Sequence, residues 1–346
     1  WSSSFAGYRP DPACEWATRG ARLAAVTESA APSVAVVIPS WNSAELLPRC
    51  LDSLRGQGAI ETFVVDNGST DGTVDLLRER GIPHLTLPEN RGFATAVDRA
   101  VAATRAPLVL PLNADTELEP GAVAALVAAL EADPSLGGVA PRILQVEGGA
   151  RDVSAARLYS AGQALTRDGR AVEIGAGEGQ AGHDRGGEVF GVCGAACLLR
   201  RELFTDLGGY DESFFSFYED VDLNVRARIA GRRFAYFPEA VVWHLGNASW
   251  LASAPSPGAW NARLVARNRI VTQARFMPLR ALPRIAAVEI GALFRAARQR
   301  RLRATLRGKI EGLARIPAAL RERRRLAARG DLERARVWLG RGADDA

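Results

Sequence analysis

The sequence predicts an α/β fold with a mainly parallel sheet covered by helices on both faces, followed by a basic helical region. Two observations support this prediction. Short β-rich apolar runs alternate with segments of helical spacing between residues 34 and 112, and polar turns follow most of these runs. The 346 residues are 47% hydrophobic and 24% charged, which is ordinary for a globular protein and argues against wholesale disorder.

Repeated strand and helix patterns open the predicted domain. Val34–Ile38 is an unbroken apolar run ended by Pro39, as expected of a strand buried on both faces, and 46–55 then has helical spacing. Further strands are expected at 62–65, 85–87 and 108–112, and further helices at 70–80 and 93–103. This alternation indicates a parallel sheet with crossover helices.

Polar residues follow three of these strands, at 39–42, 66–69 and 113–115. Ligands of such sheets bind at the carboxyl ends of the strands, so we expect the three segments to line one crevice. Each segment taken alone is equally well explained by turn chemistry, because Asn, Asp and Gly favour turns.

The composition of the sequence changes between Gln145 and Glu188, where the chain is rich in glycine and weakly periodic. A segment of this kind is either a mobile flap over a site or a surface excursion without a role. The sequence leaves both open.

An acidic cluster opens the helix expected after Tyr218. Val221, Val225 and Ile229 define its apolar face, and Gly231 is placed to end it. The aromatic residues at 214–218 would partly desolvate these acids and raise the pKa of one towards that of a useful general base. Helix capping, with surface pairing of Asp222 and Arg226, is the structural alternative.

His244 follows a strand-like run at 240–243. An imidazole at a strand end can complete a divalent metal site begun by Asp115. A histidine beside a tryptophan is more often structural, so this pattern alone does not decide between the two.

The motifs together resemble the inverting GT-A family 2 glycosyltransferases, in particular their rhamnosyltransferase-like members. The resemblance extends from about Val34 to Ser249 and depends on the order and spacing of all the motifs. They are Val37-Ile38-Pro39-Ser40-Trp41-Asn42, Val64-Val65-Asp66-Asn67-Gly68-Ser69-Thr70-Asp71-Gly72, Asn90-Arg91-Gly92-Phe93-Ala94, Leu112-Asn113-Ala114-Asp115, Tyr218-Glu219-Asp220-Val221-Asp222-Leu223 and His244.

This resemblance implies a role for each matching residue. Asp220 would be the catalytic base that takes the proton of the acceptor hydroxyl. Asp115 and His244 would hold Mn²⁺ or Mg²⁺, which neutralises the departing nucleoside diphosphate. The residues implied in donor binding are Pro39, Ser40, Asn42, Asp66, Asn67, Arg91, Asn113 and Asp115, and those implied beside the acceptor are Gly194, Ala195 and Glu219.

Two positions depart from the family pattern. Asn113 stands where the metal motif usually begins with an aspartate, so this side chain more plausibly contacts sugar or ribose. Asp98 stands where relatives often have a neutral amide, and the sequence offers no account of it.

The predicted organisation is an N-terminal extension at 1–32, a GT-A catalytic domain with a Rossmann-like sheet at 33–250 and a basic amphipathic helical region at 251–346. About half of the 44 basic residues lie after position 260, and the net charge is +5. In this last region Leu302, Leu306, Ile310 and Leu313 share one helical face, with Arg300, Arg301, Arg303 and Arg307 beside it. Such a helix suits an anionic membrane surface, although packing on protein or an oligomer contact would use the same face.

The expected partners are a dTDP- or UDP-linked sugar, with dTDP-rhamnose suggested by the resemblance, and a glycan or polyprenyl-linked acceptor of cell-envelope polysaccharide synthesis. Four scattered cysteines and the lack of a long apolar run predict a cytoplasmic chain, peripheral on the inner face of a bacterial plasma membrane. Nucleic acid is not expected, because no recognised module accompanies the arginines. The alternative function is a non-catalytic, membrane-associated protein that binds sugar nucleotides.

Overall fold

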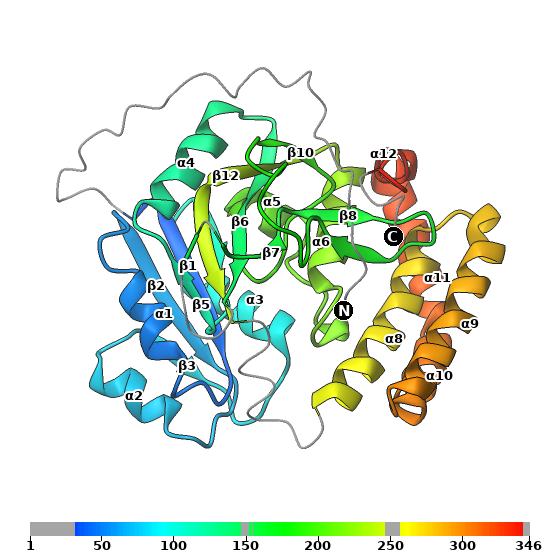
Figure 1. The fold of residues 1–346 in the computed structure, drawn as a ribbon, viewed down its shortest axis with the longest axis horizontal. Coiled ribbons are helices and arrows are strands. Elements are labelled where there is room, and N and C mark those ends of the chain that lie inside the picture. The colour runs from blue at the N-terminus through cyan, green and yellow to red at the C-terminus, as the bar shows by residue number, and fades with distance from the viewer. Residues whose placement is uncertain (1–31, 147–151, 154, 246–256, 342–346) are drawn as a thin grey trace.

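The computed structural model describes residues 32–146, 152–153, 155–245 and 257–341. A twisted, mainly parallel sheet with helices on both faces occupies one side of the molecule, and a layer of C-terminal helices stands beside it (Figure 1). The predicted extension at 1–32 and the predicted boundary near 250 lie almost wholly outside the described residues.

The strands, in chain order, are β1 (Val34–Ser40), β2 (Ile60–Asp66), β3 (His84–Thr86), β4 (Leu108–Pro111), β5 (Thr116–Leu118), β6 (Leu136–Gln145), β7 (Leu158–Ser160), β8 (Gln163–Leu165), β9 (Ala171–Glu173), β10 (Gly187–Val189), β11 (Leu198–Arg200) and β12 (Arg233–His244). The helices are α1 (Leu47–Ser53), α2 (Thr73–Glu79), α3 (Phe93–Ala103), α4 (Ala122–Ala132), α5 (Arg201–Asp206), α6 (Glu219–Ile229), α8 (Pro257–Phe276), α9 (Leu282–Arg298), α10 (Leu302–Ala314), α11 (Ile316–Arg329) and α12 (Leu332–Arg336), with 3₁₀ turns η1 (Glu212–Phe214) and η2 (Leu279–Ala281).

The main sheet has the strand order β10-β12-β6-β11-β4-β1-β2-β3, with β5 paired to β12 and β7 paired to β6. β1, β2, β3 and β4 run parallel to one another, and β6 runs parallel to β12. β11 is antiparallel to both of its neighbours and joins these two parallel blocks. Parallel strands therefore end together at one edge, as the strand and helix repeats predicted.

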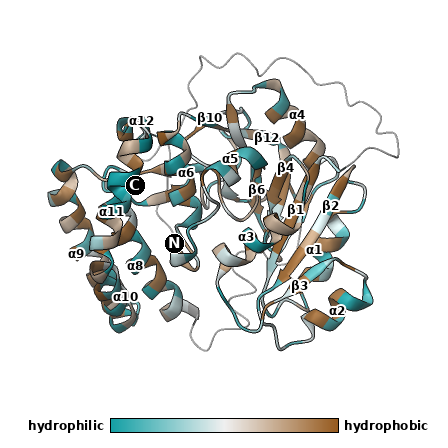
Figure 2. Cartoon of the chain, turned by 180° about the vertical axis from the view of Figure 1, so that it is seen from behind, coloured by the Kyte–Doolittle hydropathy of each residue, from teal (hydrophilic) through white to brown (hydrophobic). Residues whose placement is uncertain are grey.

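Alternate residues of β1 pack on opposite faces of the sheet. Val34, Val36 and Ile38 pack in the core that contains α1 and α4. Ala35 and Val37 pack in the core that contains α3, α5 and part of α6. The strand is apolar throughout because both of its faces are buried, and Figure 2 shows β1, β2 and β4 as hydrophobic ribbons between the helices.

Two expected element boundaries need correction. The helix expected at 70–80 begins at Thr73, because Gly72 has φ +90° and Asp71 accepts hydrogen bonds from the backbone N–H and hydroxyl of Thr73. The strand expected at 108–112 ends at Pro111, and Leu112 instead forms an isolated bridge with Ala196.

The glycine-rich segment contains short strands instead of a structureless loop. β7 joins the main sheet, β10 pairs with β12, and β8 and β9 form a two-stranded hairpin. Ala164 and Leu165 of β8 are 1% and 3% exposed, so this hairpin is packed into the protein. Figure 1 shows it between the main sheet and the C-terminal helices.

The C-terminal helices cover α6. The apolar face predicted for α6, which consists of Val221, Val225 and Ile229, packs with Phe276 of α8 and Leu326 of α11. Asp222 is fully buried and pairs with Arg226 at 2.7 Å and with Arg275 of α8 at 2.7 Å. The predicted Asp222–Arg226 pair therefore exists, but it is buried and not on the surface.

α3 is attached to the following layer through Asp98. Its Oδ1 accepts a hydrogen bond from the backbone N–H of Tyr210 at 3.0 Å. Gly209 comes so close to this carboxylate that an added Cβ would lie 2.8 Å from Asp98 Oδ1. Asp98 therefore stabilises the turn after α5. Burial of Asp98 raises the pKa of its carboxyl to about 7.

Candidate active site

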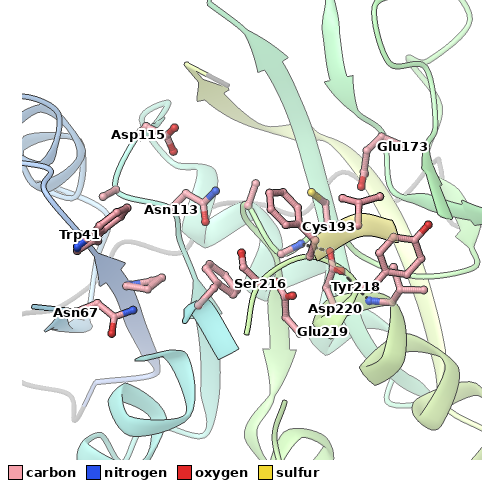
Figure 3. A pocket seen from close by; sticks show the side chains of 18 of the residues that line it. Trp41, Asn67, Asn113, Asp115, Glu173, Cys193, Ser216, Tyr218, Glu219 and Asp220 are labelled. Atoms are coloured by element: carbon pink, nitrogen blue, oxygen red, sulfur yellow. Dashed lines mark hydrogen bonds between the residues drawn. The ribbon is translucent and has the colours of Figure 1, made fainter. Parts of the chain in front are cut away.

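A polar pocket of about 250 Å³ lies at the carboxyl ends of β1 and β4 and is closed on the opposite side by the hairpin and the start of α6. In Figure 3 Trp41 and Asn67 lie on one side, Asn113 lies nearer the centre, and Cys193, Asp220 and Glu173 lie on the other side. The pocket thus joins the strand ends singled out in the sequence to the acidic helix. Of the residues with implied roles, it is lined by Pro39, Ser40, Asn67, Asn113, Asp115, Gly194, Ala195, Glu219 and Asp220.

Asp66, at the end of β2, is fully buried and does not line the pocket. It is paired in the sheet with Ser40 of β1, which does. Asp66 Oδ2 accepts a hydrogen bond from the Ser69 backbone N–H at 3.2 Å, whereas Asp66 Oδ1 has no hydrogen-bond partner among the described residues. The Oγ of Ser40 on the adjacent strand is likewise buried without a partner there. Buried polar atoms are nearly always hydrogen-bonded, so these two atoms favour a bound donor or acceptor at this place.

The side-chain amides of Asn67 and Asn42 link the loops that follow β1, β2 and β3 through hydrogen bonds. Asn67 Oδ1 accepts from the Arg91 backbone N–H at 2.8 Å, and its Nδ2 donates to the Gly92 carbonyl at 3.1 Å. Asn42 Oδ1 accepts from the Thr70 backbone N–H at 2.8 Å, and Asn42 does not line the pocket. The geometry gives both amides a clear role in shaping the wall.

The Arg91 side chain lies outside the pocket. It pairs with Glu89 at 3.2 Å and is 58% exposed. In this conformation it does not reach a ligand in the pocket.

Asp115 lines the pocket, and the buried His244 lies against it. Asp115 Oδ1 is 3.2 Å from His244 Nε2, and Asn113 Nδ2 is 3.5 Å from the same nitrogen. Tyr159 packs edge-on against the imidazole, with ring centroids 4.3 Å apart. A carboxylate oxygen and an imidazole nitrogen at this separation can face one divalent ion, with other coordination positions left for diphosphate and water.

A strained loop leads into α6. Phe215, Phe217 and Tyr218 all have positive φ, between 65° and 73°. Non-glycine residues in this region cost roughly 1–3 kcal/mol each and persist only where the surroundings hold them. Here the Nδ2 of Asn268, on α8, lies within hydrogen-bond distance of three loop carbonyls, those of Phe214, Ser216 and Phe217, at 2.7–3.0 Å.

Asp220 is held by three hydrogen bonds at the first turn of α6. Its Oδ2 accepts from Gly194 N–H at 2.9 Å and from Gln163 Nε2 at 2.8 Å, and its Oδ1 accepts from Val221 N–H at 2.8 Å. Ala195, the next residue after Gly194, accepts from the Asn113 backbone N–H at 2.9 Å. The segment at 194–195 therefore links the metal motif to the acidic helix.

Among the pocket residues without a predicted role are Tyr159, Gln163, Glu173 and Cys193. They come from β7, the β8–β9 hairpin and the loop before β11. Apart from the position of Cys193 next to Gly194, no local pattern distinguishes them. Their position was decided by tertiary packing.

Three carboxyl groups, those of Glu173, Glu219 and Asp220, line the part of the pocket formed by the hairpin and the start of α6. Burial raises the pKa of Glu173 to about 7, and the nearby Asp220 charge adds to the rise. Burial also raises the pKa of Asp220, against hydrogen bonds that lower it, and raises that of Glu219 well above its usual range. Glu219 Oε2 has no hydrogen-bond partner among the described residues. The group as a whole therefore retains protons at neutral pH more readily than free carboxyls.

Within the described residues, Glu173, Cys193 and Asp220 form the one group of three possible ligands whose ligand atoms all lie within 4.8 Å of one another, as a metal ion would require. Burial raises the pKa of the Cys193 thiol well above its usual range, so in the metal-free protein this thiol is neutral.

The chain belongs to the family described as "Glycosyl transferase family 2", whose model matches residues 35–208, about half of the chain. It is 30% identical over 215 residues to an N-acetylglucosaminyl-diphospho-decaprenol L-rhamnosyltransferase of Mycobacterium tuberculosis, which covers 56% of this chain and 68% of that protein. A pre-mycofactocin glycosyltransferase of the same species is 32% identical over 243 residues, covering 68% of this chain and 48% of the relative. The predicted family is thereby confirmed.

Among solved structures the fold is similar to that of "GalNAc-T7 with UDP, GalNAc and Mn2+", with a TM-score of 0.53 and 18% identity over 71% of this chain and 50% of the other. The sheet, its helices on both faces and the C-terminal helices confirm the predicted GT-A fold. The chain is a glycosyltransferase of this fold. In the described residues, no helix has both the length and the apolar character needed to cross a bilayer.

Proposed function

We propose that the chain is an inverting glycosyltransferase that moves a sugar from a nucleoside-diphosphate donor to a hydroxyl of a glycan or lipid-linked acceptor. The observation that carries this proposal is the placement of Asp220 and Asp115 in one pocket, on the acceptor side and the donor side respectively. A protein that only bound sugar nucleotides would not need a desolvated carboxylate on the acceptor side.

The proposed reaction is a single displacement. The acceptor oxygen forms a bond to the anomeric carbon as the bond to the diphosphate oxygen breaks, and the hydroxyl proton passes to Asp220. Asp66 Oδ1 would accept a hydrogen bond from the nucleobase, and Glu219 would orient the acceptor. Asp115 and His244 would hold a divalent ion, which offsets the negative charge of the leaving diphosphate.

The donor proposed for the first test is dTDP-rhamnose, with UDP-linked sugars as alternatives. The similarity to the mycobacterial rhamnosyltransferase, whose name includes a diphospho-decaprenol, supports this choice and the proposal of a lipid-linked acceptor. A matching chemical reason is the neutral, partly aromatic lining around Trp41, Phe93 and Tyr159, which suits a deoxysugar better than a charged one.

The test is a panel of nucleotide sugars, each measured for hydrolysis and transfer with Mn²⁺, Mg²⁺ or chelator, together with Asp220→Asn. We expect one donor to turn over and the variant to lose about 10²–10⁴-fold in turnover while its donor affinity is retained. If no donor turns over with any ion while binding persists, the chain is a sugar-nucleotide-binding protein instead.

We further propose that α9 and α10 rest on an anionic membrane surface. α10 packs on α8 through Gly308 and Gly312, and Lys309 pairs with Glu289 of α9, so the predicted apolar row of α10 is left exposed, with Ile310 67% and Leu313 56% exposed. On the neighbouring α9, Ile290 and Phe294 are 57% and 70% exposed. Exposed arginines accompany both rows, at 284, 295, 298, 300, 301, 303 and 307, and Figure 2 shows the mixed hydropathy of these helices.

Vesicle sedimentation tests this surface. Vesicles with phosphatidylglycerol should bind the chain more tightly than phosphatidylcholine vesicles, since each arginine near anionic headgroups contributes about 1 kcal/mol. Phe294→Glu and Ile310→Glu should each weaken binding about tenfold, whereas Leu85→Glu, on the distant β3, should not. Equal binding of all variants, or a dimer that Ile310→Glu dissociates, would contradict the membrane proposal.

A further inference from the structure

The carboxylates of Glu173 and Asp220 are bridged by one side-chain amide. Gln163 Nε2 donates one hydrogen bond to Asp220 Oδ2 at 2.8 Å and another to Glu173 Oε1 at 2.9 Å. The other oxygen of Glu173, Oε2, accepts from the Ser160 hydroxyl at 2.5 Å. The β8–β9 hairpin thus presents a second acid to the acid at the start of α6.

The direction of this amide is fixed by a further amide behind it. Asn224 Nδ2 donates to the Val192 carbonyl at 2.9 Å and to Gln163 Oε1 at 2.8 Å. A backbone carbonyl can only accept, so the nitrogen of Asn224 must face it, and the oxygen of Gln163 must then face Asn224. The two N–H groups of Gln163 are therefore directed to the two carboxylates.

The surroundings supply no positive charge to this pair. Across the described part of the chain, neither Glu173 nor Asp220 has an ion pair with Arg, Lys or His. The other titratable groups near the two carboxyls are Tyr159 of β7, Cys193 and Cys197 before β11, Tyr210 after α5, and Glu219 of α6. Burial raises the pKa of each of them, and the charge of Asp220 adds to the rise, so these groups hold their protons at neutral pH.

We propose that Glu173 is a positioning residue for Asp220, because through Gln163 it fixes the orientation of the base. This inference rests on the proposed function. Burial and the nearby charge of Asp220 raise the pKa of Glu173 to about 7, so Asp220 ionises first and Glu173 keeps its proton in the acid range. The proton that leaves the acceptor hydroxyl goes to Asp220 in the step described above, and Glu173 neither forms nor breaks a covalent bond.

Two sets of variants test this role. Glu173→Ala removes the acceptor that holds Gln163, so kcat should fall roughly tenfold. In Glu173→Gln an amide oxygen can still accept from Gln163, so most of the rate should remain, and the acid limb of kcat against pH should stay in place because Glu173 is neutral across it. In Gln163→Met both carboxyl groups remain but the donor to Asp220 is lost. The acid limb should therefore move to higher pH.

Glu173→Asp keeps the carboxyl group and should leave the limb near its wild-type position, and Glu239→Gln, at an exposed residue of β12, is the matched control. Thermal unfolding of each variant separates loss of fold from loss of rate. A limb that stays in place in Gln163→Met, or a kcat in Glu173→Ala equal to that of wild type, overturns the inference. A change confined to the acceptor KM also overturns it, because Glu173 would then bind acceptor directly. Wild-type turnover and Asp220→Asn test the proposed function separately from these shifts.

Discussion

The donor side and the acceptor side of the pocket are built in different ways. The donor side consists of consecutive parallel strands, whose ends at β1, β2 and β4 bring Ser40, Asp66 and the Asn113–Asp115 segment together. The acceptor side is assembled from a hairpin, a strained loop and a helix that α8 holds in place. Donor-side residues are thus placed by sheet topology, whereas acceptor-side residues are placed by contacts between distant segments.

This difference predicts that the acceptor side is the part most sensitive to loss of structural contacts. Asp222→Ala would leave the buried Arg226 without a carboxylate and Arg275 with Asp211 alone, and should lower the free energy of unfolding by about 3–5 kcal/mol. Chemical denaturation measures this value. Asp75→Ala, which breaks the exposed pair with Arg78, is the control and should cost about 1 kcal/mol or less. Similar losses in both variants would contradict the distinction.

On the donor side the largest expected effect is on rate. Asp115→Ala should lower turnover by about 10²–10³-fold, because the leaving diphosphate loses its charge stabilisation. Excess Mn²⁺ should not restore the rate, whereas the melting temperature should change little. Asp206→Ala, at an exposed position of α5, is the control. If the rate of Asp115→Ala depends on metal ions in the same way as that of wild type, Asp115 is not a metal ligand.

A smaller effect is expected at Asp66. Asp66→Ala should weaken binding of the nucleoside diphosphate about 10- to 100-fold, the value of a hydrogen bond to a charged group, with kcat at saturation within a few-fold of wild type. Titration calorimetry with the free nucleotide measures it. A fall in kcat at unchanged affinity would mean that Asp66 acts in the chemical step and not in donor binding.

A further effect concerns pH and stability. Burial raises the folded pKa of Glu173 to about 7, so between its unfolded value and this pH the folded state holds the proton more tightly. Its contribution to stability is present at low pH and is lost as pH rises to about 7, by at most about 1.4 kcal/mol per pH unit. Relative to wild type, Glu173→Gln should therefore gain stability between pH 5 and 7.5, as thermal unfolding can measure. A constant difference would contradict the raised pKa.

The sequence alone supported a large part of the donor side. β1 and α3 were predicted with nearly correct bounds, because an unbroken apolar run ended by a proline and a helical run that follows a glycine are local signals. Helix α6, its apolar face and its end near Gly231 were predicted for the same reason. Asp98, left without an account by the sequence, fastens the turn at Gly209–Tyr210, a contact made across the domain.

The fold class, the family and the motif residues at the strand ends were determined by sequence, since periodicity and turn chemistry act over a few residues. Only the tertiary structure decided that Asp222 is buried, that the apolar row of α10 is exposed, and that the glycine-rich segment supplies Gln163 and Glu173. Gln163 meets Asp220 across 57 residues of chain. No local pattern encodes such a contact, because its hydrogen bonds form only after the hairpin, α6 and α8 have packed together.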